Sequence, residues 1–337
     1  MAVARTRCRQ ALRRTRSTFS RGRVVLLVGA LLASGCGTFM DKGALAPKGP
    51  AASDYEKIFW YSTWTAVVVF VVVMGLLLFA IFRPRGEEPS RLDGNRFVVL
   101  GGLVIPAVIL MGMLGLTVTG LNFTPQEGDV EISVIGHQFW WEVYYPEGDF
   151  ETANEIHIPV HTPVELKLAS DDVIHSFWVP ELAGKQDLVP GRENRLIIEA
   201  EEPGTYRGQC AEYCGLQHAN MLIRVIAHPH EEFEAWKEEQ TRPAAVRDAR
   251  AEEIFQANCA GCHTIRGTTS TGEFGPDLTH LASRETLGSV MIPNERGHLA
   301  GWIVNSQTIK PGNEMPPITT LEPEELRLLL DYLEALK

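Results

Sequence analysis

Two long uncharged runs of apolar residues lie near the start of the chain. Residues 58–82 (IFWYSTWTAVVVFVVVMGLLLFAIF) and residues 97–118 (FVVLGGLVIPAVILMGMLGLTV) contain no charged side chain. Each exceeds the roughly 18 residues expected of a membrane-spanning helix, and such helices tolerate a proline like Pro106. A buried core helix is the alternative for either run, but it is expected to be shorter. The pattern predicts a two-helix transmembrane hairpin over residues 55–120.

The segment between the two runs is rich in arginine. Residues 83–96 (RPRGEEPSRLDGNR) carry four arginines, and loops rich in positive charge remain on the cytoplasmic side of a membrane. Both ends of the hairpin, and everything after residue 120, are then expected on the outer face. We therefore expect a multi-pass membrane protein whose long C-terminal part lies outside the cytoplasm.

The first 35 residues have the pattern of a targeting segment. An arginine-rich stretch leads into VVLLVGALLASGC (residues 24–36), whose apolar part is too short for an ordinary spanning helix. The small residues Ala33, Ser34 and Gly35 before Cys36 resemble a bacterial lipoprotein cleavage box. A signal peptide over residues 1–35, of lipoprotein type, is the prediction. An ordinary signal peptide with an incidental Cys36 is the alternative.

Beyond the hairpin the pattern changes to short runs rich in β-branched and aromatic residues. Six runs between residues 129 and 228 (VEISVIG, FWWEVYY, EIHIPV, VELKLAS, RLIIEA and MLIRVIA) are separated by clusters of Gly, Pro, Asp and Asn. Short strands at this spacing predict a β-sandwich or barrel. The charged residues 229–248 are expected to form a helical or extended linker. Near the C-terminus, Pro323 and apolar residues at intervals of three and four predict a closing helix.

Charge and cysteine usage narrow the classes of partner and cofactor. The formal charge of −11 becomes −19 without the eight arginines of residues 1–35. Such an acidic exterior argues against nucleic acid and favours basic protein partners. Four of the six cysteines lie in two short clusters, 210–214 and 259–262. This spacing indicates metal or haem binding rather than a disulfide framework.

Residues 208–221 (GQCAEYCGLQHANM) gather soft and borderline donor atoms. Cys210, Cys214, His218 and Met221 offer two thiolates, an imidazole and a thioether within twelve positions. Zinc sites favour a CxxC spacing and seldom use a thioether, whereas this donor set favours copper in an electron-transfer role. A mononuclear blue-copper site needs one cysteine, so two cysteines indicate two coppers bridged by both sulfurs.

Two bridged coppers need a second histidine and a further weak ligand. His175, in DDVIHSFWVP, is the best candidate for the histidine, and the backbone carbonyl of Glu212 is a candidate for the weak ligand. Buried cysteines with an incidental histidine are the alternative, which the type and order of the donors disfavour. His157 and His161 are expected to be surface strand residues rather than ligands.

Residues 175–192 (HSFWVPELAGKQDLVPGR), followed by the cysteine loop, resemble subunit II of haem–copper cytochrome c oxidases. The resemblance covers about residues 55–228. It implies a cupredoxin-like Greek-key β-barrel over residues 129–228, behind the membrane hairpin, that holds a binuclear CuA centre. The implied copper ligands are His175, Cys210, the carbonyl of Glu212, Cys214, His218 and Met221.

The same resemblance implies how this chain meets its partner subunit. The Glu212 side chain would contribute to a magnesium site shared with subunit I, and Asp187 and Arg192 would lie in the stretch that meets subunit I. Two features depart from the family. Where relatives have a tryptophan after GHQ that receives electrons from soluble cytochrome c, this chain has Phe139, followed by two tryptophans. The second apolar run also lacks the acidic residue that relatives associate with a proton channel.

A second cofactor signature follows the predicted linker. Cys259, Cys262 and His263 form CxxCH, which is typical of c-type haem attachment through two thioethers and a proximal histidine. A redox disulfide or a zinc knuckle is the alternative for CxxC alone, and the adjacent histidine disfavours both. A methionine as second axial ligand raises the haem potential. Met315 in GNEMPPI is the candidate, and Met291 is expected to be a packing residue.

Residues 249–337 resemble an all-α class I cytochrome c domain, since GNEMPPI is similar to the Met-Pro-Pro turn of that family. The stretch GHLAGWIVNSQTIKPG adds a likeness to oxidases in which a haem c domain is fused to subunit II. The two resemblances together identify the chain as subunit II of a bacterial cytochrome c oxidase with a fused cytochrome c domain.

This identification implies a route for electrons. A cytochrome c donor would reduce haem c, CuA would follow, and subunit I would reduce O₂ and pump protons. The expected partners are subunit I and other oxidase subunits, the donor and the lipid membrane. A related nitric oxide reductase is one alternative, because that distinction lies in the catalytic subunit. A membrane-anchored copper chaperone is another, but it leaves His218, Met221 and the CxxCH motif unexplained.

Overall fold

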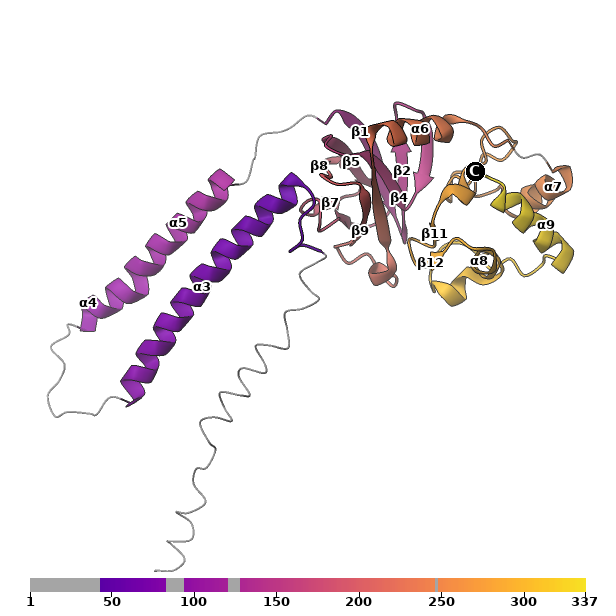
Figure 1. Ribbon diagram of the computed structural model, residues 1–337. Coiled ribbons are helices and arrows are strands. Elements are labelled where there is room, and N and C mark those ends of the chain that lie inside the picture. Colours follow the sequence, from indigo (N-terminus) through magenta and orange to yellow (C-terminus); the bar gives the residue numbers. More distant parts are fainter. Residues whose placement is uncertain (1–42, 83–93, 121–127, 246–247) are drawn as a thin grey trace, which may run out of the picture. The chain divides into compact units, whose positions relative to one another are not determined.

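The computed structural model describes residues 43–82, 94–120, 128–245 and 248–337. The predicted signal peptide, its lipoprotein box and most of the arginine-rich segment between the apolar runs lie outside these residues. Pro47–Lys337 form one unit by their internal contacts. Within this unit a helical hairpin comes first, then a strand domain, then a helical domain (Figure 1).

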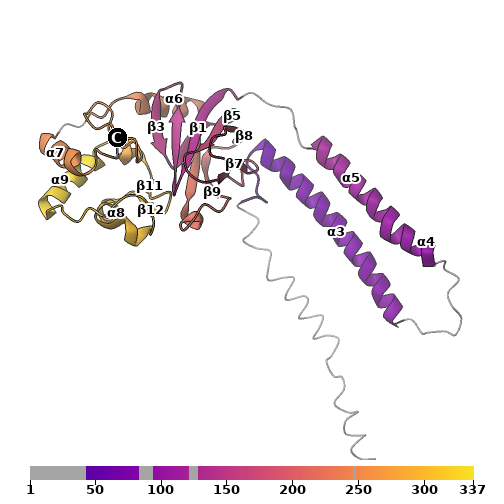
Figure 2. The same ribbon diagram turned by 180° about the vertical axis from the view of Figure 1, so that it is seen from behind.

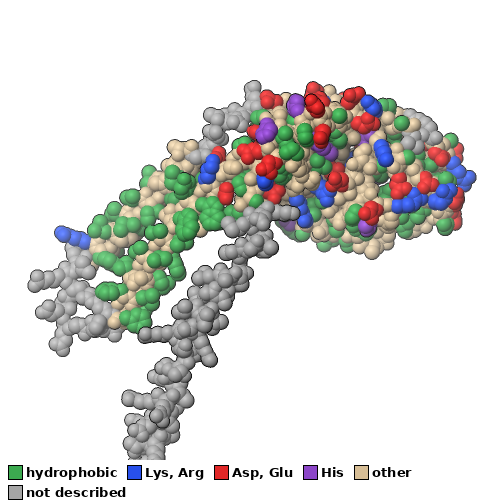
Figure 3. Space-filling model, in the orientation of Figure 1, with side chains coloured by type: hydrophobic (Ala, Val, Ile, Leu, Met, Phe, Trp, Pro, Cys, Tyr) green, Lys and Arg blue, Asp and Glu red, His purple; other side chains and the backbone are tan. Residues whose placement is uncertain are grey.

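Two helical runs that are long and apolar enough to cross a membrane match the predicted hairpin. They lie side by side in Figure 1, and hydrophobic side chains cover them in Figure 3. Phe70, for example, is 61% exposed, and an apolar surface of this extent is suited to lipid rather than water. The elements are α3 (Pro50–Phe82), α4 (Gly94–Val99), the π-helical turn η1 (Leu100–Val104) and α5 (Ile105–Gly120).

The π-helical turn has a local cause. It ends at Val104, two residues before Pro106, whose nitrogen carries no hydrogen and whose ring crowds the carbonyl four residues earlier, within the turn. Widening the helix by one residue per turn relieves that crowding, and such single turns are known adjustments within α-helices. The run therefore continues through the proline, as expected of a spanning helix.

The strand domain consists of two five-stranded sheets. Their strand orders are β3-β2-β1-β5-β8 and β4-β10-β9-β6-β7, and Figure 2 shows the first sheet from behind. The pairs β1 with β5 and β4 with β10 are parallel, and the other neighbours are antiparallel. The strands are β1 (Val130–His137), β2 (Trp140–Tyr145), β3 (Phe150–Ala153), β4 (Glu155–Pro159), β5 (Val164–Ser170), β6 (His175–Trp178), β7 (Gln186–Leu188), β8 (Asn194–Ile198), β9 (Gly204–Cys210) and β10 (Leu222–His228).

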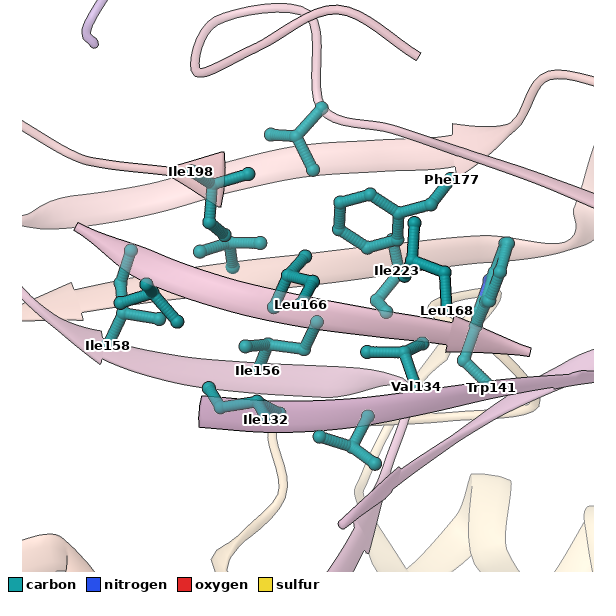
Figure 4. Close-up of a cluster of buried hydrophobic side chains, with 14 of the residues drawn as sticks. Ile132, Val134, Trp141, Ile156, Ile158, Leu166, Leu168, Phe177, Ile198 and Ile223 are labelled. Atoms are coloured by element: carbon teal, nitrogen blue, oxygen red, sulfur yellow. The ribbon is translucent and has the colours of Figure 1, made fainter. Parts of the chain in front are cut away.

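The core of this domain lies between the sheets. Buried and partly exposed residues alternate along β1, where Ile132 and Val134 point inward. Figure 4 shows Leu166 of the first sheet in one cluster with Ile156 and Phe177 of the second. Each fully buried side chain of this kind contributes about 1.5–3 kcal/mol. The predicted cupredoxin-like fold is confirmed, and its core supplies a rigid base for the loops at its edge.

The segment predicted as a linker forms α6 (His230–Thr241), which packs on β4 and β10. Phe233 of this helix is buried. The Trp236 ring stacks on His157 at 4.0 Å between centroids, and His228 stacks on His157 at 5.0 Å. The expectation that His157 lies at the surface is therefore wrong: the ring is half-buried because α6 covers it.

The C-terminal domain contains three α-helices around a small apolar core that includes Phe255, Ile303 and Leu329. Glu322 and Glu325 form a capping box at the start of the predicted closing helix, with Pro323 at its first position. A short two-stranded ladder accompanies the helices. The elements are α7 (Ala249–Asn258), η3 (Leu281–Ser283), β11 (Thr286–Leu287), β12 (Ile292–Pro293), α8 (Arg296–Ile309) and α9 (Pro323–Glu334).

Candidate metal and haem sites

The cysteine loop is held at both ends by paired strands. Cys210 is the last residue of β9 and Met221 directly precedes β10, and these strands are antiparallel neighbours. The Cys210 amide donates to the Met221 carbonyl at 2.9 Å, which closes the loop at its base. The turn η2 (His218–Asn220) fills the return path. The side chains of the loop are thus carried on a short segment with fixed ends.

The first half of the donor set surrounds Cys210. Its sulfur lies 3.8 Å from the Cys214 sulfur, 3.9 Å from His175 Nδ1 and 3.1 Å from the Glu212 carbonyl oxygen. His175 is contributed by β6, which pairs with β9. The sequence separates His175 from the loop by 35 positions, and the sheet brings them together.

The second half of the donor set surrounds Cys214. Its sulfur lies 3.8 Å from His218 Nδ1 and 3.8 Å from Met221 Sδ. All the predicted copper donors therefore converge on one pair of sulfurs. Among the described residues, the cluster His175, Cys210 and Cys214 also has its ligand atoms within 4.8 Å of one another.

The electrostatics of the two thiols suit a cation. The largest effect on the pKa of Cys210 is the hydrogen bond that its sulfur shares with Cys214, which lowers it. The same hydrogen bond raises the pKa of Cys214, which keeps the shared proton. Such a pair gives up one proton readily and resists losing the second. A bound cation removes that resistance, because metal-bound thiols are deprotonated outright. The donor chemistry thus fits a copper pair bridged by two thiolates.

A hydrogen bond to Asp172 fixes the orientation of the His175 ring. Its Nε2 lies 2.7 Å from Asp172 Oδ1, so Nε2–H donates to the carboxylate and Nδ1 faces Cys210. Burial lowers the pKa of His175, but the hydrogen bonds with Cys210 and Asp172 outweigh it and the net pKa is raised. Gly136 of β1 leaves room for the ring, because a Cβ there would lie 2.8 Å from Cδ2.

The CxxCH segment begins where α7 ends. His263 Nδ1 lies 2.8 Å from the Pro276 carbonyl oxygen, so Nδ1–H donates and Nε2 is left for a metal. Burial lowers the pKa of His263, which favours the neutral imidazole that a metal requires. Gly275 allows this placement, since a Cβ there would lie 2.6 Å from the ring.

A pocket lies over His263 and is lined mainly by apolar side chains. Cys259, Cys262 and His263 form one part of its lining, and Met315 and Trp302 another. Hydrogen bonds from Ser306 Oγ (2.7 Å) and Gln307 Nε2 (2.9 Å) to the Met315 carbonyl fix the methionine turn. Met291 is not among the lining residues. The pocket therefore brings together the four residues predicted to hold haem.

Two lining residues gave no signal in the sequence. Arg284 is buried, and its Nε has no hydrogen-bond partner among the described residues. A buried donor of this kind calls for an anionic acceptor, and the propionates of a haem supply one. Lys310 also lines the pocket. Arg284 belongs to no motif, and Lys310 lies near the end of GHLAGWIVNSQTIKPG without a role that its residue type reveals, so the fold identifies both.

Part of the pocket wall comes from the strand domain. Gln138, Phe139 and Trp140 line it together with residues of the helical domain. Gln138 Nε2 also donates to the Cys214 carbonyl. One side chain thus contacts both the cysteine loop and the haem pocket.

The residues predicted to meet subunit I lie near the copper donors in the sheet. Asp187 of β7 pairs with Ser176, the neighbour of His175, and its carbonyl accepts from Asn194 Nδ2 at 2.7 Å. Arg192 is exposed. The Glu212 carboxylate accepts from the Tyr213 amide at 3.2 Å.

Comparisons with known proteins match both domains of the chain. A family model described as "Cytochrome C oxidase subunit II, periplasmic domain" matches residues 147–228, and one described as "Cytochrome c" matches residues 249–337. Cytochrome c oxidase subunit 2 of Alkalihalophilus pseudofirmus is 34% identical over 331 residues, covering 91% of this chain and 94% of the relative. That of Bacillus subtilis is 29% identical over 350 residues, covering 94% and 98%. The periplasmic domain of subunit II from Bradyrhizobium japonicum is 32% identical, with a TM-score of 0.33, covering 34% of this chain and 95% of that structure.

Proposed function

The chain belongs to the cytochrome c oxidase subunit 2 family, and we propose that it receives electrons at its own haem c and delivers them through a binuclear copper centre. It is a subunit of a haem–copper oxidase whose O₂-reducing site lies on another chain. When bound, the haem and the copper pair supply one-electron transfer. The chain's own side chains hold these groups, orient them and exclude water from them.

Copper binding is assigned to six donors. Two strands fix the loop that carries most of them, and β6 adds the remaining histidine, so little of the protein has to move when the charge of the site changes. The observation that carries the assignment is the convergence of every donor on two sulfurs 3.8 Å apart. The donors are His175 Nδ1, Cys210 Sγ, the Glu212 carbonyl, Cys214 Sγ, His218 Nδ1 and Met221 Sδ.

Haem attachment is assigned to the CxxCH pocket. Cys259 and Cys262 would form the thioethers, and His263 Nε2 and Met315 Sδ would be the ligands of the iron. Arg284 is the partner for a propionate, because its Nε is buried and lacks an acceptor among the described residues. The support is the pocket that these residues line together.

The remaining assignments concern the surroundings of the two sites. Both apolar helical runs cross the bacterial inner membrane, and the folded domains lie on the periplasmic side after removal of a lipoprotein-type signal peptide. The Glu212 side chain contributes to a magnesium site shared with subunit I. The donor is a basic protein such as a cytochrome c, because the chain carries a formal charge of −11.

The copper assignment is tested by replacing one bridging sulfur. Cys214→Ser removes a thiolate without a large change in volume, so the mixed-valence copper signal in electron paramagnetic resonance should disappear. Elemental analysis of the unaltered protein should give two coppers per chain. A single copper, or zinc, in their place contradicts the assignment.

The haem assignment is tested with two methionines. Met315→His changes the axial ligand and should lower the potential, whereas Met291→Leu should leave the spectrum unchanged because Met291 is not among the residues that line the pocket. Loss of the sulfur-to-iron charge-transfer band in Met291→Leu alone would reverse the assignment.

A further inference from the structure

The cytochrome domain is docked on the copper domain, not merely tethered to it. Ser289 Oγ donates to the Leu222 carbonyl at 2.6 Å, one residue after the copper ligand Met221. Gln217 Nε2 donates to the Pro311 carbonyl at 2.8 Å. Both bonds involve residues in or next to the cysteine loop, so the docked surface is the rim of the proposed copper site.

A second group of contacts lies along β4 and β10. Glu155, which is 2% exposed, accepts from the Glu285 amide at 3.1 Å and from Thr286 Oγ1 at 3.3 Å. Arg224 forms an ion pair with Glu285. A buried carboxylate needs such partners, because an unsatisfied one is strongly destabilising. These contacts favour one arrangement of the two domains over others.

Lys310 makes the most extensive polar contact of this interface. Its Nζ donates to Phe139 O at 2.7 Å, Asn220 O at 2.9 Å and Gly288 O at 2.9 Å. The residue is 2% exposed. Burial lowers its pKa to about 7, but an ammonium group has three protons for these three acceptors, which favours the charged form.

Two of the three acceptors border the proposed copper site. Asn220 precedes the ligand Met221, and Phe139 follows Gln138, whose side chain donates to the Cys214 carbonyl. The third, Gly288, belongs to the cytochrome domain and lines its pocket. One side chain therefore connects the copper loop, the wall shared by both sites and the haem pocket.

We propose that Lys310 is a positioning residue that fixes the haem pocket of the cytochrome domain against the Gln138–Phe139 wall of the copper domain. The inference rests on the proposed function, since it concerns electron transfer between the two sites. Electron transfer slows steeply with distance, so a residue that fixes the distance also fixes the rate.

The first test uses the unaltered protein with its haem and copper. An amine-reactive ester is applied at about pH 8, and acetylation of each lysine is followed by mass spectrometry. Lys310 should react at least about tenfold more slowly than Lys337, which is exposed at the C-terminus, because reaction requires the interface to open. Equal rates overturn the proposal. Copper and haem spectra of the same sample show separately whether the proposed function stands.

The second test uses variants of the whole oxidase. Lys310→Met keeps the length of the side chain and removes its three donors. Hydrogen exchange should accelerate in residues 216–222 and 285–291, and electron transfer from haem to copper after flash reduction should slow about tenfold or more. The absorption spectra of both groups should stay as in the unaltered protein. Lys337→Met is the matched control and should change neither measurement.

Lys310→Arg refines this result. Arginine keeps the charge, but its planar fork cannot direct three protons from one atom toward three carbonyls. Hydrogen exchange in this variant should lie between that of the unaltered protein and that of Lys310→Met. Unchanged exchange and unchanged electron transfer in Lys310→Met overturn the proposal. If that variant loses either spectrum through misfolding, the acetylation rate of Lys310 in the unaltered protein decides.

Discussion

Adding one methyl group behind a proposed copper ligand should weaken copper binding by a calculable amount. In Gly136→Ala the new Cβ would lie 2.8 Å from His175 Cδ2 and 3.0 Å from Cγ, well inside the roughly 3.5 Å at which carbon atoms attract. With copper bound, the ring would be held at both nitrogens, by the metal at Nδ1 and by Asp172 at Nε2 (2.7 Å), and could not retreat. Overpacking of this kind costs about 1–3 kcal/mol. In the metal-free protein the ring can swing away, whereas bound copper forbids it, so affinity should fall about 5- to 150-fold.

The assay is a competition between the protein and a chelator for copper, with the mixed-valence spectrum recorded at each point. Gly297→Ala in α8 is the control, because a Cβ there meets no atom within 4 Å and alanine is favourable in a helix. Its copper affinity should match that of the unaltered protein. If Gly136→Ala also binds copper with unchanged affinity and spectrum, His175 does not hold the metal from the position assigned to it.

Three further outcomes are expected. Gly275→Ala places a Cβ 2.6 Å from the His263 ring and should weaken the iron–histidine bond, seen as a shifted Soret band. Burial holds the pKa of His157 well below its usual value, so the folded state binds fewer protons than the unfolded state once the pH drops below about 6.5. The free energy of unfolding should therefore decrease as the pH is lowered from about 6.5, by up to about 1.4 kcal/mol per pH unit per proton. His157→Phe should weaken this pH dependence in thermal unfolding. Deleting residues 249–337 should preserve the copper signal but sharply slow oxidation of soluble cytochrome c in stopped flow, and an unchanged rate would show that haem c is not where electrons arrive.

The residues of both candidate sites could be predicted because their chemistry is local in the sequence. The cysteine loop holds most of its donors within twelve positions, and CxxCH is contiguous. Such short segments display their donor types directly. The need for a second histidine then indicates the distant His175, which the family resemblance also implies. The two long apolar helices could also be predicted, because a long uncharged apolar run is the property that a spanning segment requires.

The contacts between domains could not be predicted, because they join residues far apart in the chain. Lys310 and Phe139 are separated by 171 positions, and Glu155 meets Thr286 across 131. A lone lysine, or a glutamate on a strand, is usually a solvated surface residue, so its type carries no signal of burial. The same reason explains the error at His157: the apolar face that covers it belongs to α6, in a segment read as a charged linker.

Docking also gives a physical reason for the departure at Phe139. This side chain is 6% exposed and its carbonyl accepts from Lys310, so a soluble protein cannot reach it while the domains stay together. An aromatic residue that receives a transient partner has to present its face to solvent, whereas Phe139 and Trp140 line the pocket of the chain's own cytochrome domain. Phe139 is thus covered by the chain's own cytochrome domain. Under the proposed function, an external donor would therefore approach the haem pocket from elsewhere. Phe274 lines this pocket, is 76% exposed and follows the acidic Glu273, so it marks where the pocket reaches the surface. The charge of the donor would then affect the rate of association, which should decrease as salt is added. The rate of electron transfer between the two sites within the chain should not depend on salt in this way.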